Sequence, residues 1–150
     1  PKNLPSEKRT GIVHGDYSLT NVMIGKNDPN VIAILDWELS TLGDPCADFN
    51  YHCLQYTMNP KLADKAYCKN QGIPVIDDYV KMYTEKINID LTEEWDLYSA
   101  YNLFKLAGIL QGILGRVRDG TAAHENAAER ASGVRNLSDK AWDLVKKNFL

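Results

Sequence analysis

Short apolar runs separated by polar turns fill the first part of the chain. Residues 12–13 and 22–24 are apolar and flank a polar loop, and residues 31–35 form a further apolar run after the polar stretch 26–30. Apolar segments of this length, bounded by Asn, Asp, Gly and Pro, are typical of strands joined by a turn. The pattern therefore predicts a small β-hairpin over residues 22–35, preceded by a polar loop.

Helical periodicity replaces this pattern further along the chain. The Asp-Pro pair at 44–45 supplies an N-cap and a suitable first helical residue, so we expect a helix that runs to Tyr56. A shorter helix is expected from Pro60 until the Gly-Ile-Pro break at 72–74, and another from 76 to 87. The chain is thus predicted to be α+β and mainly helical.

The longest helix is expected over residues 92–118, with Thr92 as its N-cap. It is apolar over most of its circumference, which predicts burial at the centre of the fold. Arg116 and Arg118 fall in its last turn, where cations are favourable beside the free carbonyl groups, although an anionic substrate could meet them instead. Three glycines, three and four residues apart, favour close helix packing over a phosphate loop: Gly108, Gly112 and Gly115.

The end of the chain is more polar. An alanine-rich segment spans residues 121–132, and a final amphipathic helix is expected from Ser138. Residues 119–150 hold five acidic and five basic side chains. This balance argues against a polycationic ligand, whose binding calls for clustered carboxylates.

Composition sets outer limits on the protein. At 150 residues and 44% hydrophobic content, the chain suits one globular domain at most. Its net charge of -3 gives no basic surface for nucleic acid, and no apolar run approaches the roughly 20 residues that span a bilayer. Three cysteines without a C-x-x-C pair suit reduced thiols. We therefore expect an intracellular protein, with the cytoplasm favoured over an organelle.

The candidate chemistry lies in the first third of the chain. Asp16 and Asn21 stand five residues apart in the polar loop, and Asp36 directly follows the apolar run 31–35. If the hairpin brings them together, they supply two oxygen ligands for a hard divalent cation and a carboxylate that can accept a proton from a hydroxyl. A D-x-x-x-x-N pair alone is often only a turn, because Asp and Asn bond their own backbone. Its occurrence with His14 and Asp36 favours chemistry, since protein kinases use the same parts.

Three motifs in order resemble those of a known family. Residues 14–21, His-Gly-Asp followed by Asn, resemble the HGDxxxxN signature of the aminoglycoside phosphotransferase and choline kinase-like family, and residues 34–38 resemble its metal-binding motif. Residues 43–48 resemble the GDPxxDL segment, although Phe49 stands where that pattern has Leu. The wording LDWELSTLGDP is most similar to the kinase-like domain found beside acyl-CoA dehydrogenase modules.

The resemblance implies a protein-kinase-like fold, of which residues 1–150 would be the C-terminal lobe with a small β-hairpin carrying the catalytic loop. The N-terminal lobe is expected to be absent from this chain, because nothing matches a G-x-G-x-x-G loop or a V-A-I-K-like strand. Pro1 in place of Met and the polar stretch 1–10 also indicate a fragment. On its own, the chain is expected to be a poor catalyst.

Site roles follow from the resemblance. Asp16 would be the catalytic base, while Asn21 and Asp36 would hold Mg²⁺ on the phosphates of ATP. Met23 and Leu35 would lie against the adenine, although a core methionine is an equal alternative for Met23.

Two further residues would support the site. His14 is expected to hold the loop by packing and hydrogen bonding rather than to donate protons. Asp48 is expected to accept hydrogen bonds from the loop backbone, besides its favourable position in the first turn of a helix.

The sequence thus predicts an ATP- and Mg²⁺-dependent phosphotransferase that acts on a hydroxyl group of a small molecule. Resemblance to the dehydrogenase-linked branch hints at a hydroxyacyl-type acceptor and at an acyl-CoA dehydrogenase module in the intact protein. Two alternatives stay open: a pseudokinase-like binding or scaffold module, and, less favoured, a metal-dependent phosphohydrolase.

Overall fold

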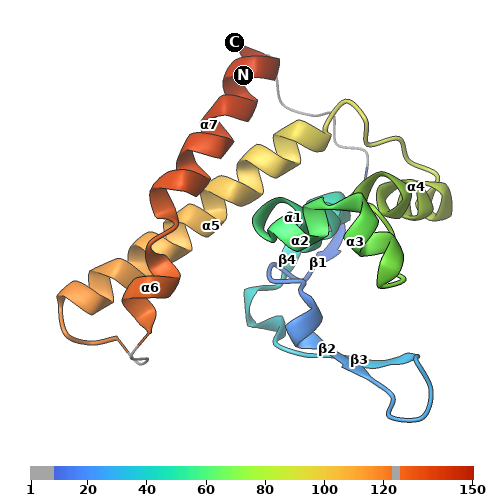
Figure 1. Ribbon diagram of the computed structural model, residues 1–150, viewed down its shortest axis with the longest axis horizontal. Coiled ribbons are helices and arrows are strands. Elements are labelled where there is room, and N and C mark those ends of the chain that lie inside the picture. Colours follow the sequence, from blue (N-terminus) through green and yellow to red (C-terminus); the bar gives the residue numbers. More distant parts are fainter. Residues whose placement is uncertain (1–8, 123–125) are drawn as a thin grey trace. The chain divides into compact units, whose positions relative to one another are not determined.

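The computed structural model describes residues 9–122 and 126–150 and is mainly helical, as the sequence predicts, with two small sheets (Figure 1). The chain divides after Glu94 into two compact units, which are described in turn. In chain order, the described elements are β1 (Gly11–Val13), the 3₁₀ turn η1 (Leu19–Asn21), β2 (Val22–Ile24), β3 (Val31–Ile34), the 3₁₀ turn η2 (Trp37–Leu39), β4 (Thr41–Gly43), α1 (Pro45–Met58), α2 (Pro60–Ala63), α3 (Lys65–Asn70), α4 (Ile76–Ile87), α5 (Trp95–Arg118), α6 (Ala127–Ala131) and α7 (Val134–Phe149).

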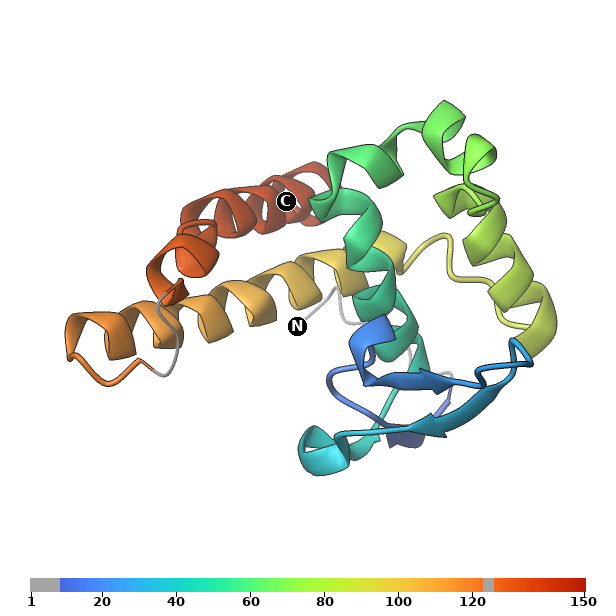
Figure 2. The same ribbon diagram turned by 60° about the horizontal axis from the view of Figure 1, so that its bottom comes forward.

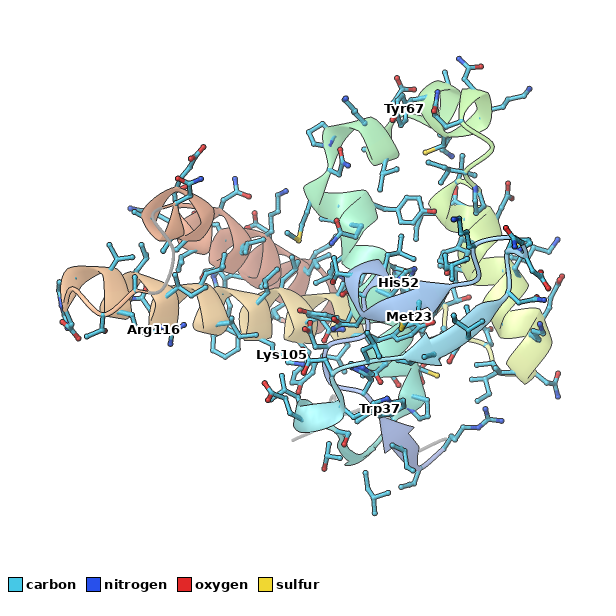
Figure 3. All side chains as sticks on the ribbon, turned by 90° about the horizontal axis from the view of Figure 1, so that it is seen from below. Met23, Trp37, His52, Tyr67, Lys105 and Arg116 are labelled. Carbon is cyan, nitrogen blue, oxygen red and sulfur yellow. The ribbon has the colours of Figure 1, made fainter. Side chains whose placement is uncertain are left out.

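The predicted hairpin is present as the antiparallel pair β2 and β3, drawn in blue and cyan in Figure 2. Val22 pairs with Ile34, and the register shifts between Met23 and Ile24. Met23 on β2 is labelled in Figure 3. This hairpin follows the polar loop directly, so it fixes where the loop ends.

A second antiparallel pair, β1 with β4, was not predicted. Ile12 lies opposite Leu42, and Gly11 lies opposite Gly43. Strand β1 leads into the polar loop, whereas β4 leads into α1. The pairing therefore brings the first turn of α1 beside the start of the loop.

Helix α1 begins as expected and ends two residues later than expected, at Met58 rather than Tyr56. The Asp44 carboxylate caps it by accepting a hydrogen bond of 2.9 Å from the backbone N–H of Cys46. On its buried face, the ring of Phe49 stacks on Tyr83 of α4 with centroids 3.7 Å apart. This ring contact packs α1 against α4.

The three cysteines are free thiols and are buried in this unit. Cys46 and Cys53 lie on α1, and Cys68 lies on α3 with none of its surface exposed. Burial raises the pKa of Cys53 to about 12, because the apolar surroundings disfavour the thiolate. These side chains therefore behave as small core residues.

Between α1 and α4 the chain forms two helices where one was predicted. The Asp64 carboxylate accepts hydrogen bonds from the backbone N–H groups of Ala66 and Tyr67, at 2.8 and 3.3 Å. This cap begins α3 and ends α2 at Ala63. The sequence predicts one helix from Pro60 to the break at residues 72–74, and the cap at Asp64 divides it in two.

In the second unit, α5 packs along α7 and against α6. Helix α5 begins at Trp95 rather than Thr92, because the Asp90 carboxylate accepts from both the N–H and the hydroxyl of Thr92 and holds it in a preceding turn. Helix α7 begins at Val134, four residues before the predicted Ser138. The backbone of both helices is therefore offset from the predicted start.

The predicted central burial of α5 is wrong for one of its faces. Leu103 is 1% exposed, but Phe104 is 71% exposed. At Gly108 and Gly115 an added Cβ would have no heavy atom within 4 Å, so the close helix packing expected there is absent from the described residues. A helix that is apolar all round can be packed on every side, but the number of packing partners is not set by its own sequence. Within the second unit, α6 and α7 cover only part of α5.

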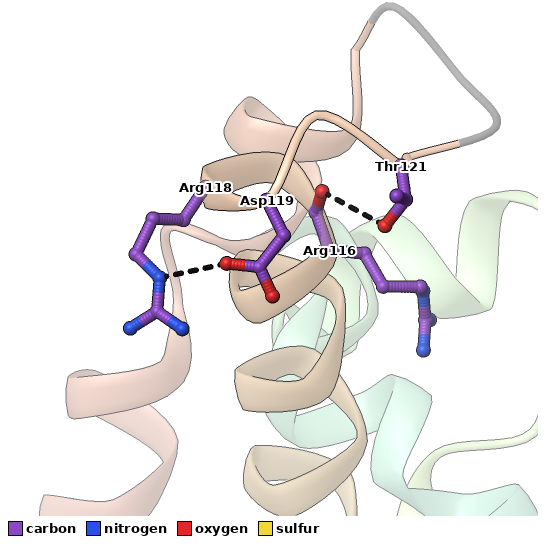
Figure 4. A network of polar contacts seen from close by, with 4 residues as sticks. All are labelled: Arg116, Arg118, Asp119 and Thr121. Carbon is purple, nitrogen blue, oxygen red and sulfur yellow. Dashed lines mark hydrogen bonds and ion pairs between the residues drawn. The ribbon is translucent and has the colours of Figure 1, made fainter.

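Helix α5 ends in a Schellman motif. Figure 4 shows this end of the helix from nearby, with the Thr121 hydroxyl donating to the Arg116 carbonyl at 3.4 Å and Arg118 paired with Asp119. The N–H of Thr121 donates to the carbonyl of Arg116 at 2.9 Å, and the N–H of Gly120 donates to the carbonyl of Val117 at 3.1 Å. Arg118 pairs with the neighbouring Asp119 at 3.0 Å, and both side chains are well exposed. An exposed ion pair of this kind adds little stability. The two backbone hydrogen bonds of the Schellman motif are therefore what ends the helix.

Truncating Leu103 to Ala tests the packing of the second unit. The side chain is 1% exposed, so Leu103→Ala is expected to lower the free energy of unfolding by about 2–5 kcal/mol in a urea titration. Gln111→Ala on the exposed side of α5 is the matched control and should change it by less than about 0.5 kcal/mol. Equal effects would contradict the assignment of the buried face.

Candidate functional site

The start of the polar loop at 14–21 is hydrogen-bonded to a carboxylate from another element. Asp48, in the first turn of α1, accepts hydrogen bonds from the backbone N–H groups of His14 and Gly15, the second at 3.0 Å. These bonds to a charged acceptor are stronger than neutral ones. The contact is the one that the resemblance implied for Asp48.

His14 is 3% exposed and uses both of its ring nitrogens within the structure. Its Nδ1 accepts from the backbone N–H of Asp16 at 3.2 Å, and its Nε2 lies 2.7 Å from the carbonyl oxygen of Leu35. Only the tautomer with the proton on Nε2 satisfies both contacts. His14 thus ties the loop to the end of the hairpin and has no nitrogen left for proton transfer.

Asn21 joins the two ends of the loop. Its Nδ2 donates to the carbonyl oxygen of Asp16 at 3.0 Å and reaches the Asp16 carboxylate at 3.3 Å. The backbone carbonyl of Asn21 accepts from the N–H of Leu35 at 2.8 Å. Asp16 and Asn21 are therefore in contact, and the Asn21 amide turns its oxygen away from that bond.

Asp36 follows directly on the residue that the loop holds. Both polar backbone groups of Leu35 bond to the loop, so the Asp36 backbone is fixed beside it. Asp36 has φ 66° and ψ 55°, a left-handed conformation that Asp tolerates better than most residues. The side chain of Asp36 is exposed, and Asp36 is the residue directly before η2. The structure thus anchors all three predicted ligand and base residues in one region of the first unit.

The turn after Asp36 packs directly on the loop. Gly15 has φ +83°, and a Cβ added there would lie 2.5 Å from the carbonyl oxygen of Leu39. The ring of Trp37 lies against His14 with centroids 4.8 Å apart and donates its N–H to the carbonyl of Ile34 at 2.8 Å (Figure 3). A glycine is required at position 15 for two separate reasons, conformation and space.

Met23 and Leu35 are each 45% exposed. Met23 lies opposite Ala33 in the hairpin, and Leu35 follows β3. Neither side chain is part of the buried core, so the core reading of Met23 does not hold. Their role in binding the adenine stays a prediction.

Sequence reasoning missed Tyr51. Its hydroxyl hydrogen-bonds to the Asp16 side chain, and burial, that hydrogen bond and the charge of Asp16 together raise the pKa of Tyr51 well above its ordinary value. Tyr51 lies three residues after Asp48 on α1, and residues at this spacing share one helix face. That spacing was the signal that could have found it, given that Asp48 faces the loop.

The next residue on α1, His52, is part of an aromatic group. Its Nε2 lies 3.1 Å from the hydroxyl of Tyr79, and its ring lies 5.4 Å from that of Tyr17. Burial lowers the pKa of His52, because the charged imidazolium is disfavoured there. Within residues 9–122 and 126–150, no group of three or more His, Cys, Asp and Glu side chains could hold a metal ion. His52 is therefore a packing residue in this structure.

Residues 1–101 match the phosphotransferase enzyme family, abbreviated APH. The chain belongs to this family. A crystal structure from Ralstonia eutropha, whose name provisionally assigns it to the aminoglycoside phosphotransferases, is 39% identical with a TM-score of 0.87. That match covers all of the chain and 47% of the solved one.

Other relatives of this APH family chain are named as acyl-CoA dehydrogenases. The chain is 36% identical to mouse acyl-CoA dehydrogenase family member 10 and 33% identical to human family member 11, over 98% and 99% of its own length. It is also 33% identical to the probable acyl-CoA dehydrogenase IBR3 of Arabidopsis thaliana over 97% of its length. The chain spans only 14%, 20% and 18% of these three proteins.

Among the helices that the structure describes, none combines the length and the apolar character needed to cross a bilayer.

Replacing Gly15 by Ala tests the contact between the loop and the turn after Asp36. Gly72 is the matched control, because it also has positive φ but an added Cβ there would meet nothing within 4 Å. Gly72→Ala should cost about 1–2 kcal/mol of unfolding free energy for the left-handed backbone alone. Gly15→Ala should cost about 1–3 kcal/mol more, because the methyl group meets the Leu39 carbonyl. Equal losses in urea titrations would contradict the close approach.

Proposed function

We propose that this chain carries the catalytic base and the metal ligands of an ATP- and Mg²⁺-dependent phosphotransferase that acts on a hydroxyl group of a small molecule. The observation that supports this most directly is the hydrogen-bonded pair of Asp16 and Asn21, joined through Leu35 to Asp36. In a member of a phosphotransferase family, this arrangement gives each of the three residues a role.

The donor atoms suit Mg²⁺. Asn21 offers an amide oxygen and Asp36 an exposed carboxylate, and Mg²⁺ binds oxygen ligands. Mg²⁺ in nucleotide enzymes is held by one or two protein ligands together with phosphate oxygens, which is compatible with the absence of a larger acidic cluster among the described residues. When bound, the ion neutralises charge on the nucleotide phosphates.

Asp16 would orient the acceptor hydroxyl and accept its proton. The Asn21 amide and the Tyr51 hydroxyl both donate to its side chain, which fixes the orientation of the carboxylate. A carboxylate held in this way meets the acceptor hydroxyl in a fixed orientation. Positioning of this kind supplies most of the catalysis in phosphoryl transfer, together with electrostatic stabilisation. The role of His14 is to keep this loop in place.

The nucleotide would need a second surface. Met23 and Leu35 are exposed and would lie against the adenine from one side. We infer that residues 1–150 form the C-terminal lobe and that an N-terminal lobe covers the phosphates, because the chain matches 47% of the solved relative. The isolated chain is expected to be a poor catalyst for this reason.

The acceptor is proposed to be of hydroxyacyl type. Relatives are named as acyl-CoA dehydrogenases, and most of their length lies outside the matched region. An acyl-CoA dehydrogenase module in the intact protein would act on acyl chains, so a hydroxyl on such a chain is a suitable acceptor for the phosphoryl group.

The test uses a protein that joins this chain to its N-terminal lobe. ADP release is followed with Mg²⁺, ATP and a panel of hydroxylated metabolites that includes hydroxyacyl compounds. Asp16→Ala is expected to lower kcat by about 10²- to 10⁴-fold, because the positioned base is lost. Activity that survives Asp16→Ala undiminished would remove Asp16 from this role.

The outcomes also separate the alternative functions. Calorimetric binding of Mg²⁺ and ATP without transfer to any acceptor would favour a scaffold. Hydrolysis of a phosphoester in the absence of acceptor would favour a phosphohydrolase. Either result would overturn the proposed transfer reaction.

The metal ligands have a test of their own. Asp36→Asn is expected to raise the Mg²⁺ concentration needed for half-maximal activity at least about tenfold, because a charged ligand is lost. Asp28→Asn is the matched control, since Asp28 is exposed in the hairpin turn and bonds to Asn30. A Mg²⁺ requirement that is unchanged in Asp36→Asn would exclude Asp36 as a ligand.

A further inference from the structure

We propose that Tyr51 is a positioning residue that holds the Asp16 carboxylate in the orientation required for proton transfer. This inference rests on the proposed function, because it gives Tyr51 a role in the same reaction. Tyr51 acts through its contact with Asp16 and is not assigned a contact with the substrate.

The Asp16 side chain needs a hold of this kind. Asn21 reaches its carboxylate at 3.3 Å, beyond the usual range for an N–H···O hydrogen bond, and spends its better bond on the Asp16 backbone carbonyl at 3.0 Å. The amide therefore fixes the backbone more firmly than the carboxylate. The Tyr51 hydroxyl donates to the side chain from a different element, α1. Two donors from separate directions leave the carboxylate far less rotational freedom than one.

Tyr51 is a suitable donor for this purpose. Its ring is rigid and is half-buried on a helix, so its hydroxyl has little freedom to move away. Burial, the hydrogen bond to Asp16 and the charge of Asp16 raise the pKa of Tyr51, which favours the protonated hydroxyl. The hydroxyl is therefore an uncharged donor at neutral pH.

Other titratable groups near Asp16 are already engaged or are directed elsewhere. The Nδ1 of His14 accepts from the Asp16 backbone, and the Asp48 carboxylate accepts from the loop backbone. Asp36 is exposed beyond the loop. Among these groups, Tyr51 alone donates a side-chain hydrogen bond to the Asp16 carboxylate, so its removal has a distinct effect.

One face of α1 would then fix both the backbone of the loop and the side chain of Asp16. Asp48 and Tyr51 stand three residues apart on α1, and they hold the backbone and the side chain of the same loop. The conformation of the loop and the direction of its carboxylate are therefore fixed by one rigid element.

The test is Tyr51→Phe in the two-lobed protein, which removes only the hydroxyl. We expect kcat to fall about tenfold, the order of one hydrogen bond to a charged group, with the KM for ATP changed less than twofold. Tyr56→Phe, which loses a hydrogen bond from the same helix to the carbonyl of Pro74, should leave both unchanged.

A double-mutant cycle separates positioning from general support of the fold. If Tyr51 acts through Asp16, adding Tyr51→Phe to Asp16→Ala should lower kcat less than twofold further. A full tenfold loss in that background would overturn the inference.

The contact can also be tested without activity. In the NMR spectrum of the two-lobed protein with ¹³C-labelled tyrosine, Asp16→Ala should move the ring resonances of Tyr51 and leave those of Tyr56 in place. If no acceptor is phosphorylated, the proposed function fails, whereas a Tyr51 resonance that moves still supports the hold on Asp16. A Tyr51 resonance that stays in place would overturn this inference by itself.

Discussion

The site depends on one carboxylate that binds two adjacent backbone amides. Asp48 accepts from His14 and Gly15, and each hydrogen bond to a charged group is worth about 1.5–3 kcal/mol. A typical domain is stable by only about 5–15 kcal/mol, so these two bonds are a large share of what fixes the loop. The first turn of α1 is also where the helix dipole favours a negative charge. Because β4 pairs with β1 and leads into α1, the sheet brings the acceptor to the donors.

The hairpin is attached to this loop through polar backbone groups. Leu35 donates to Asn21 and accepts from His14, so its amide and carbonyl both join the loop before the chain turns at Asp36. The close approach of Gly15 to Leu39 completes the attachment on the other side of the turn. The relative positions of the proposed base and metal ligands therefore follow from main-chain contacts, which are less mobile than contacts between long side chains.

The sequence was most informative where local chemistry decides structure. The hairpin, the cap at Asp44 and the break at residues 72–74 each depend on residue types with strong local preferences, and all three are present. Strand β4 was not predicted, because three residues carry no periodicity and their pairing with β1 is set by distant contacts. The burial of α5 was overestimated, since hydrophobicity does not specify the number of partners. Tyr51 was missed because its contact depends on which face of α1 meets the loop.

The buried thiols give the first unit a built-in reporter. Cys46, Cys53 and Cys68 are each at most 3% exposed, and burial raises the pKa of Cys53 to about 12. Alkylating reagents attack the thiolate, so at neutral pH they should modify these sulfurs only when the surrounding helices open. The rate of alkylation would thus measure how often this part of the molecule opens under native conditions, with no added probe and no denaturant.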